Sequence, residues 1–138
     1  MNKLSDHKKK FKEYIARLVS LTLKDGGSAS KPDVGFFLPP RDLWSFPKYP
    51  SKTAILPPTV DLALELQRFI PVNEVFLNEE DCWLGTWINP QTGDYYFDVA
   101  TGCENLSEAQ EMAHKAGVRE GRRVVALFNS KRNETVYL

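Results

Sequence analysis

Three side chains in the second half of the chain have the chemistry of an acid, a nucleophile and a base. Asp98 offers a carboxylate, Cys103 a thiol and His114 an imidazole. Catalytic groups assemble in space and not in sequence, so a small enzyme that uses all three is one hypothesis. An inert thiol and an ordinary helix histidine are the more common interpretation of the same residue types.

Other polar patterns are weaker indications of chemistry. Asp98 and Glu104 have the side chains of a carboxylate pair. The acidic turn at residues 78–81 has oxygen ligands for a divalent cation, but it lacks the spacing and the glycine hinge of a calcium loop. The sequence contains no phosphate-binding, dinucleotide-binding or zinc-protease pattern. We therefore expect no cofactor and no metal, and favour a protein without catalytic activity.

A predicted β-hairpin positions the carboxylate. Residues 82–88 and 95–99 are rich in aromatic and β-branched side chains, which are typical of strands. Between them, Pro90 suits the second position of a type I turn, and Gly93 suits the positive φ that returns the chain into a hairpin. The pattern predicts two antiparallel strands.

A helix and a second pair of strands are expected to follow the hairpin. Ser107, with Gln110 three residues later, forms a capping-box pattern, and Gly117 is expected to end the helix. The apolar run at 124–128 predicts a central strand, and 135–138 a short strand beside it. The predicted fold class is α+β, with a small antiparallel sheet built as hairpin, helix and hairpin.

This region has several turn, strand and helix motifs in a fixed order. They are Gly85-Thr86-Trp87, Asn89-Pro90, Thr92-Gly93, Tyr96-x-Asp98-Val99, Glu108-Ala109 and Ala126-Leu127-Phe128. On these motifs, residues 82–138 resemble a small domain that recurs in bacterial and phage proteins and has no settled activity. The resemblance implies a fold and a phage or mobile-element origin, and it carries over no site residue.

Length and composition favour a single domain over residues 1–138. A chain of 138 residues with 42% hydrophobic content can bury one core but not two independent ones. There is no long apolar run and no signal-peptide pattern, so we expect a cytoplasmic protein without membrane contact. In that compartment, Cys82 and Cys103 are expected to be free thiols.

The N-terminal segment, residues 1–24, is expected to form a helix with one apolar face. The apolar positions are Phe11, Tyr14, Ile15, Leu18, Val19 and Thr22. The other side has a basic run, Lys8, Lys9, Lys10 and Lys12. Such a run is found in nucleic-acid-binding proteins, although a solvated helix face is the simpler interpretation.

Charge is distributed unevenly along a chain whose net charge is +0. Residues 1–24 carry seven Lys or Arg against two acids, residues 60–120 carry three against twelve, and residues 121–138 carry four against one. Basic ends therefore flank an acidic middle. Either the ends pack beside the acidic segment, which we favour, or they face an acidic partner.

Residues 25–58 are predicted to form an irregular arm rich in proline and aromatic residues, beginning with a flexible break at 25–30. Seven of the nine prolines lie between residues 32 and 58, which argues against a long helix or a central strand there. We expect Trp44 to cover the core and Tyr49 to be exposed. Trp44, Phe46 and Tyr49 are the candidate partner-binding residues.

The remaining part, residues 59–138, is the predicted α+β core. A second helix is expected over 59–69, with Thr59 as its cap and Pro71 as its end, followed by a short strand at 75–77.

The leading hypothesis for function is a small interaction protein that binds another macromolecule, with an unknown protein as partner. The first alternative is a nucleic-acid-binding accessory protein that uses the basic helix. The second is the small enzyme considered first. A homodimer is left open.

Overall fold

A computed structural model describes residues 3–138; Met1 and Asn2, the start of the expected N-terminal segment, lie outside the described residues. The helices are α1 (Lys3–Asp25), α2 (Leu62–Val72), α3 (Glu74–Leu77) and α4 (Leu106–Glu120), with a 3₁₀ turn, η1, at Pro50–Lys52. The strands are β1 (Gly27–Lys31), β2 (Phe36–Phe37), β3 (Trp44–Pro47), β4 (Ala54–Leu56), β5 (Trp83–Ile88), β6 (Tyr95–Cys103), β7 (Ala126–Asn129) and β8 (Glu134–Tyr137).

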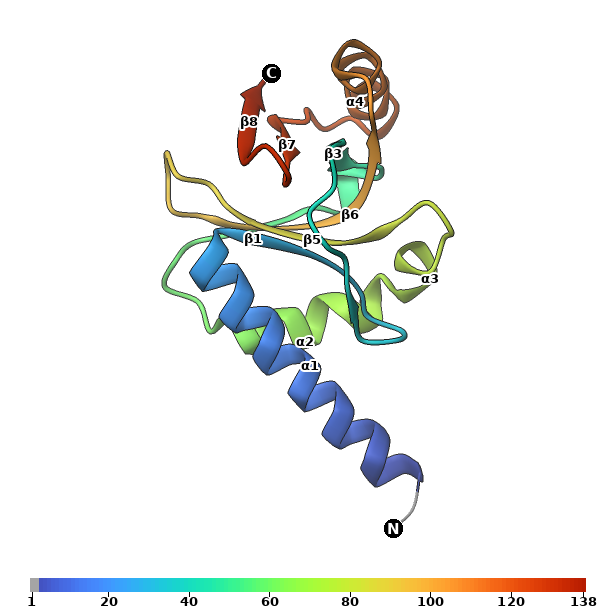
Figure 1. Cartoon of the computed structure of the whole chain (residues 1–138), viewed down its shortest axis with the longest axis vertical. Coiled ribbons are helices and arrows are strands. Elements are labelled where there is room, and N and C mark those ends of the chain that lie inside the picture. Colours follow the sequence, from blue (N-terminus) through green and yellow to red (C-terminus); the bar gives the residue numbers. More distant parts are fainter. Residues whose placement is uncertain (1–2) are drawn as a thin grey trace.

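The described residues form one antiparallel sheet of eight strands with helices packed on it. The strand order is β2-β1-β5-β6-β3-β7-β8, and β4 pairs with β6 beside this path. The sheet curls into a half-barrel, with α1 and α2 below it and α4 at its upper end in Figure 1. The mixed helix-and-sheet class and the N-terminal helix are confirmed, whereas the expectation of a small sheet is wrong.

The long strand β6 holds the half-barrel together. One edge pairs with β5, in a register that sets Gly85 opposite Asp98. The other edge pairs first with β4, where Ala54 lies opposite Phe97, and then with β3. The predicted hairpin between β5 and β6 is confirmed, and Gly93 has the expected positive φ, 80°. The change of partner along one edge lets the sheet turn back on itself.

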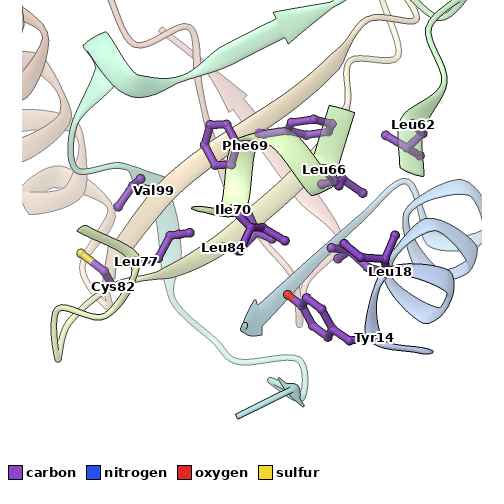
Figure 2. Close-up of a cluster of buried hydrophobic side chains, with 12 residues drawn as sticks. Tyr14, Leu18, Leu62, Leu66, Phe69, Ile70, Leu77, Cys82, Leu84 and Val99 are labelled. Atoms are coloured by element: carbon purple, nitrogen blue, oxygen red, sulfur yellow. The ribbon is translucent and has the colours of Figure 1, made fainter. Parts of the chain in front are cut away.

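The larger core cluster lies between the sheet and helices α1 and α2 (Figure 2). Tyr14 and Leu18 from α1 and Leu66 from α2 are buried against strand residues such as Leu84. The Phe69 ring meets the Phe97 ring edge-on at 5.6 Å. The apolar faces expected from helical periodicity are therefore the faces that pack.

A smaller cluster lies where α4 packs on β3. It joins Trp44 and Phe46 to Ala109, Ala113 and Leu127. The two alanines are fully buried, and their small side chains let the helix approach the strand closely.

The arm over residues 25–58 is more regular than its prolines indicate, because it contains strands β1 to β4. The expected flexible break at 25–30 includes most of β1, which pairs along β5. Pro47, which has no backbone N–H, is the last residue of β3. On the side of β7 only Ser45 of β3 is paired, so the proline removes no hydrogen bond from that ladder. The prolines delimit short strands and do not prevent them.

Helix α4 begins and ends elsewhere than predicted. The side chain of Asn105, not Ser107, accepts a hydrogen bond from the Glu108 N–H and caps the helix. The helix runs through Gly117 and ends before Gly121, whose left-handed φ of 70° closes it.

Helix α2 is also shifted along the chain. Asp61, not Thr59, caps it, and Pro71 lies inside its last turn. The expected strand at 75–77 is helical, as α3, because its backbone N–H groups bond to carbonyls one turn earlier. The run at 124–128 forms the short strand β7, which lies next to the edge strand β8 and not at the centre.

The burial of Trp44, which is 3% exposed, predicts a large effect of truncation. Trp44→Ala should lower the free energy of unfolding by about 3 to 5 kcal/mol, because it removes an indole from a packed cluster. Urea unfolding followed by circular dichroism measures this. Phe36→Ala, at a ring 53% exposed on β2, is the matched control and should cost much less. Equal losses from the two variants would contradict the assignment of Trp44 to the core.

Candidate functional site

The concave side of the half-barrel contains a cleft of about 670 Å³. Residues of β1, β5, β6, β3 and β7 line it. Figure 1 shows β7 above β5 and β6, where the curl of the sheet places it. The residues that shape it include Ala29, Gly85 and Ala100 on the floor, Trp83, Trp87 and Phe128 on the walls, and Arg17, Asp25 and Arg41 at the rim.

The space exists because β1, β5 and β6 carry small residues on the face that lines the cleft, whereas the other face of β5 and β6 carries large ones. Alternate residues of a strand point to opposite sides. On β5 and β6, Leu84 and Val99 point into the core, whereas Gly85 and Ala100 face the cleft. Ala29 on β1, which pairs with Gly85, extends the same small floor.

Aromatic side chains form the walls. Trp83 and Trp87 lie two residues either side of Gly85 and are only partly buried. The Trp87 ring meets the Tyr96 ring edge-on at 5.1 Å, and the Tyr137 ring of β8 lies 6.5 Å from it. These contacts hold the indole in place beside the open space.

The loop between β2 and β3, residues 38–43, forms part of the rim and is tied to the turn after β7. Asp42 accepts from the Arg132 guanidinium at 2.9 Å and from the side-chain amide of the buried Asn129 at 2.9 Å. The Arg41 N–H donates to the Ser130 hydroxyl at 3.0 Å. This set of bonds fixes the loop that bounds the cleft.

Asp98 is the charged group in the interior of the cleft wall. Its Oδ1 accepts a hydrogen bond from the Thr53 hydroxyl at 2.7 Å. Burial raises the pKa of this carboxyl to about 6; the Thr53 hydrogen bond and the nearby Arg122 charge offset only part of that effect. The side chain keeps some exposure because the cleft is open, while protein surrounds it on its other sides.

A second, smaller cavity of about 40 Å³ adjoins the cleft at Asp98. It shares Pro47, Trp87 and Asp98 with the cleft, and Arg122 lines it from the segment after α4. The Arg122 guanidinium donates to the carbonyl oxygens of Pro50 and Thr53. Asp98 therefore lines both spaces, and the arginine in the smaller one is already bonded to backbone carbonyls.

The structure does not assemble the three residues considered for catalysis. Asp98 and Cys103 are five residues apart on β6, which is about 16 Å along an extended strand and places them on opposite faces. The Cys103 thiol donates to Glu108 at 3.5 Å, away from the cleft. His114 is exposed on α4. The carboxyl alone belongs to the cleft.

Of the candidate partner-binding residues, Trp44 and Phe46 are each 3% exposed. Tyr49 is half-buried and thus less exposed than expected. Its hydroxyl donates to the carboxylate of Glu79, at 2.7 Å from each oxygen. The covering role expected of Trp44 agrees with its burial. A partner-binding role of these rings stays a prediction.

The basic run Lys8, Lys9, Lys10 and Lys12 is exposed on α1. Figure 1 shows this end of the helix projecting beyond the rest of the fold. These four side chains are therefore accessible to a large ligand, and they are separate from the cleft.

The acidic turn at residues 78–81 is held by two lysines. Lys48 bonds to Glu79 at 2.9 Å and to Asp81 at 3.0 Å. Lys31 donates to the carbonyl oxygens of Leu77, Glu79 and Cys82 at 3.3, 3.2 and 2.7 Å.

Glu79, Asp81 and Cys82 place three ligand atoms within 4.8 Å of one another, a spacing compatible with a metal ion. However, the Lys48 ammonium already pairs with both carboxylates. Burial raises the pKa of the Cys82 thiol to about 11, which disfavours the thiolate that a metal would need. Both cysteines are free thiols, as expected.

Comparison with protein-family models, with curated proteins and with solved structures gave no match. The resemblance to a bacterial and phage domain, the compartment and the partners therefore stay predictions. None of the helices in residues 3–138 combines the length and apolar character that a membrane crossing requires.

Sequence reasoning missed the walls and the floor of the cleft. The signal was present as Trp83-x-Gly85-x-Trp87, in which two large rings flank a glycine on one face of a strand. What that pattern does not contain is the curl of the sheet, which brings Phe128 to the same space.

The raised pKa of Asp98 predicts a pH dependence of stability. An aspartate in an unfolded chain has a pKa of about 3.9, so the contribution of Asp98 is fully present below about pH 4 and is lost as the pH rises through about 6. Relative to Asp98→Asn, the native protein should lose about 1 to 2 kcal/mol between about pH 4 and pH 7.5, a value discounted for partial exposure.

Urea unfolding of both proteins across that pH range measures the difference. Glu80→Gln, at an exposed carboxyl of the 78–81 turn, is the control and should follow the native profile. A difference between the native protein and Asp98→Asn that stays constant with pH would show that Asp98 titrates normally.

Proposed function

We propose that this chain is a non-catalytic binding protein whose ligand is a small, flat and largely apolar organic molecule held in the cleft. The observation that carries the proposal is the cleft of about 670 Å³ between two tryptophans, over a floor of small residues. Small-molecule sites in proteins have volumes of about 300 to 1,000 Å³ and are lined by apolar and aromatic side chains with a few polar groups.

The packing of the floor supports this function. A sheet face intended only for stability is covered by large side chains, as the opposite face of β5 and β6 is by Leu84 and Val99. The cleft face has Ala29, Gly85 and Ala100 at corresponding positions. Aromatic rings beside such a floor offer apolar surface to a ligand, which gains from leaving water.

The rigidity of the site also supports binding. The rim loop is held by the ion pair between Asp42 and Arg132 and by the bond from Asn129, and Trp87 is held between two tyrosines. A preorganised site spends less free energy on ordering itself when a ligand arrives. The burial of Trp44 and Phe46 behind this loop fits a supporting role better than a direct contact with a partner.

Filling the cleft tests the proposal. Ala29→Phe places a ring over the floor and should abolish binding of small aromatic fragments such as indole, which the native protein should bind at millimolar concentration. Binding is measured by chemical-shift changes of the Trp83 and Trp87 indole N–H signals. Ala16→Phe, at an exposed position on α1, is the matched control and should bind as the native protein does.

Unfolding curves of both variants establish that they fold. If indole shifted no signal of the cleft, or bound Ala29→Phe as well as the native protein, the cleft would not be the binding site.

A second candidate function is nucleic-acid binding by the exposed lysines of α1. Replacing Lys8, Lys9, Lys10 and Lys12 by glutamine should lower the slope of log affinity against log salt by about one for each lost phosphate contact. Fluorescence anisotropy with a labelled single-stranded oligonucleotide measures this slope. The Ala29→Phe variant should keep its affinity, since the lysines are separate from the cleft. Absence of binding at low salt would remove this candidate.

A further inference from the structure

We propose that the cleft selects organic cations, with a flat apolar body between Trp83 and Trp87 and an ammonium or amidinium group on the carboxylate of Asp98. This inference rests on the cleft being the ligand site, as proposed above. It adds the chemical class of the ligand and the residue that chooses it.

The register of β5 and β6 builds the site. Gly85 lies directly opposite Asp98, Trp83 lies opposite Ala100, and Trp87 lies opposite Tyr96. Residues opposite one another share a face, so the Cα atoms of the two tryptophans lie diagonally from the Cα of Asp98, at about 7 to 8 Å each. Because position 85 has no side chain, the space above Asp98 stays open.

Two aromatic residues bound that space along β5. Trp83 and Trp87 are four residues apart on a strand, which separates their Cα atoms by about 13 Å. Aromatic rings that line a cleft attract a cation through their negative faces, and the attraction is larger where water is excluded. A carboxylate at the bottom of the same space adds a charged hydrogen-bond acceptor.

The carboxylate has capacity for a further donor. An aspartate accepts about four hydrogen bonds, and within residues 3–138 Asp98 accepts one, from the Thr53 hydroxyl to Oδ1. Arg122 lines the smaller cavity, and its guanidinium bonds to two backbone carbonyls. Tyr96 and Arg123 line that smaller cavity as well. Within residues 3–138 no cationic side chain donates a hydrogen bond to Asp98, and the nearby Arg122 charge acts on it only through space.

The exposed charges at the rim have less effect on the choice of ligand charge than the carboxylate of Asp98 has. Arg17, Asp25 and Arg41 are all exposed, and the Arg17 guanidinium lies over the Phe37 ring at 4.5 Å from its centroid. Exposed charges are solvated and screened, and contribute little to recognition. The interior carboxylate therefore decides the sign of the charge that the ligand carries.

Three matched probes test the inference: phenethylamine, phenethyl alcohol and 3-phenylpropionate. With the native protein at about pH 7.5, the amine should bind about tenfold tighter than the alcohol, and the carboxylate weakest. Asp98→Asn should bring the amine within about twofold of the alcohol while leaving the alcohol unchanged. Glu80→Gln, at an exposed carboxyl outside the cleft, is the control and should keep the preference. Chemical shifts of the indole N–H signals give each affinity.

The pH dependence gives an independent measurement on the native protein. Affinity for the amine should fall about tenfold in total as the pH drops from about 7.5 to about 4 and Asp98 takes up a proton, and it should level off near the affinity for the alcohol, which should not change. This measurement decides the question should Asp98→Asn fail to fold.

The outcomes separate the two proposals. Equal affinities for amine and alcohol, or a preference for 3-phenylpropionate, would overturn cation selection and leave the cleft as a binding site. Binding of none of the three probes at about 10 mM would overturn both.

Discussion

The whole structure depends on β6 having different partners along one edge and different side chains on its two faces. One of its edges pairs first with β4 and then with β3, in a sheet that curls into a half-barrel. Its core face carries Phe97 and Val99, which are fully buried under the helices. Its other face carries Asp98 and Ala100, small or polar residues that leave room. Curvature and cleft are thus two results of the same strand.

The arm over residues 25–58 contributes both to the curvature of the sheet and to the cleft. The arm supplies the strand β3 that lets the sheet turn, the loop that bounds the cleft, and the Thr53 hydroxyl that bonds to Asp98. Its two buried rings, Trp44 and Phe46, join α4 to β7 from behind. The rim is held from the same side, since Asn129, which is fully buried, donates to Asp42. The site is therefore supported by elements that are distant in the sequence.

Local sequence patterns predicted those helices and turns whose conformation follows from the preferences of their own residues. The faces of α1 and α2 follow helical spacing, and the turn with Gly93 has the φ that only glycine adopts readily. By contrast, β1 has the sequence Gly-Ser-Ala-Ser-Lys, which has low strand propensity, and it forms because β5 offers it a partner.

The cleft could not be predicted from the sequence for a related reason. A pattern along one strand identifies which residues share a face, and so Trp83, Gly85 and Trp87 were recognisable as a group. Whether that face is covered depends on the curl of the sheet, which arises from pairings between residues far apart, such as Ser45 with Phe128. The raised pKa of Asp98 has the same origin, because the neighbours that bury it come from other parts of the chain.

The position of β1 in the sheet has a consequence for the order of events during synthesis. Gly27 pairs with Trp87, about 60 residues later in the chain. A ribosome therefore releases α1 and β1 well before the strand that anchors them exists. Until then the apolar face of α1, with Tyr14, Ile15 and Leu18, has no sheet to cover it. Nascent chains in this state expose surface that favours aggregation or chaperone binding, and folding waits for contacts that close a long loop.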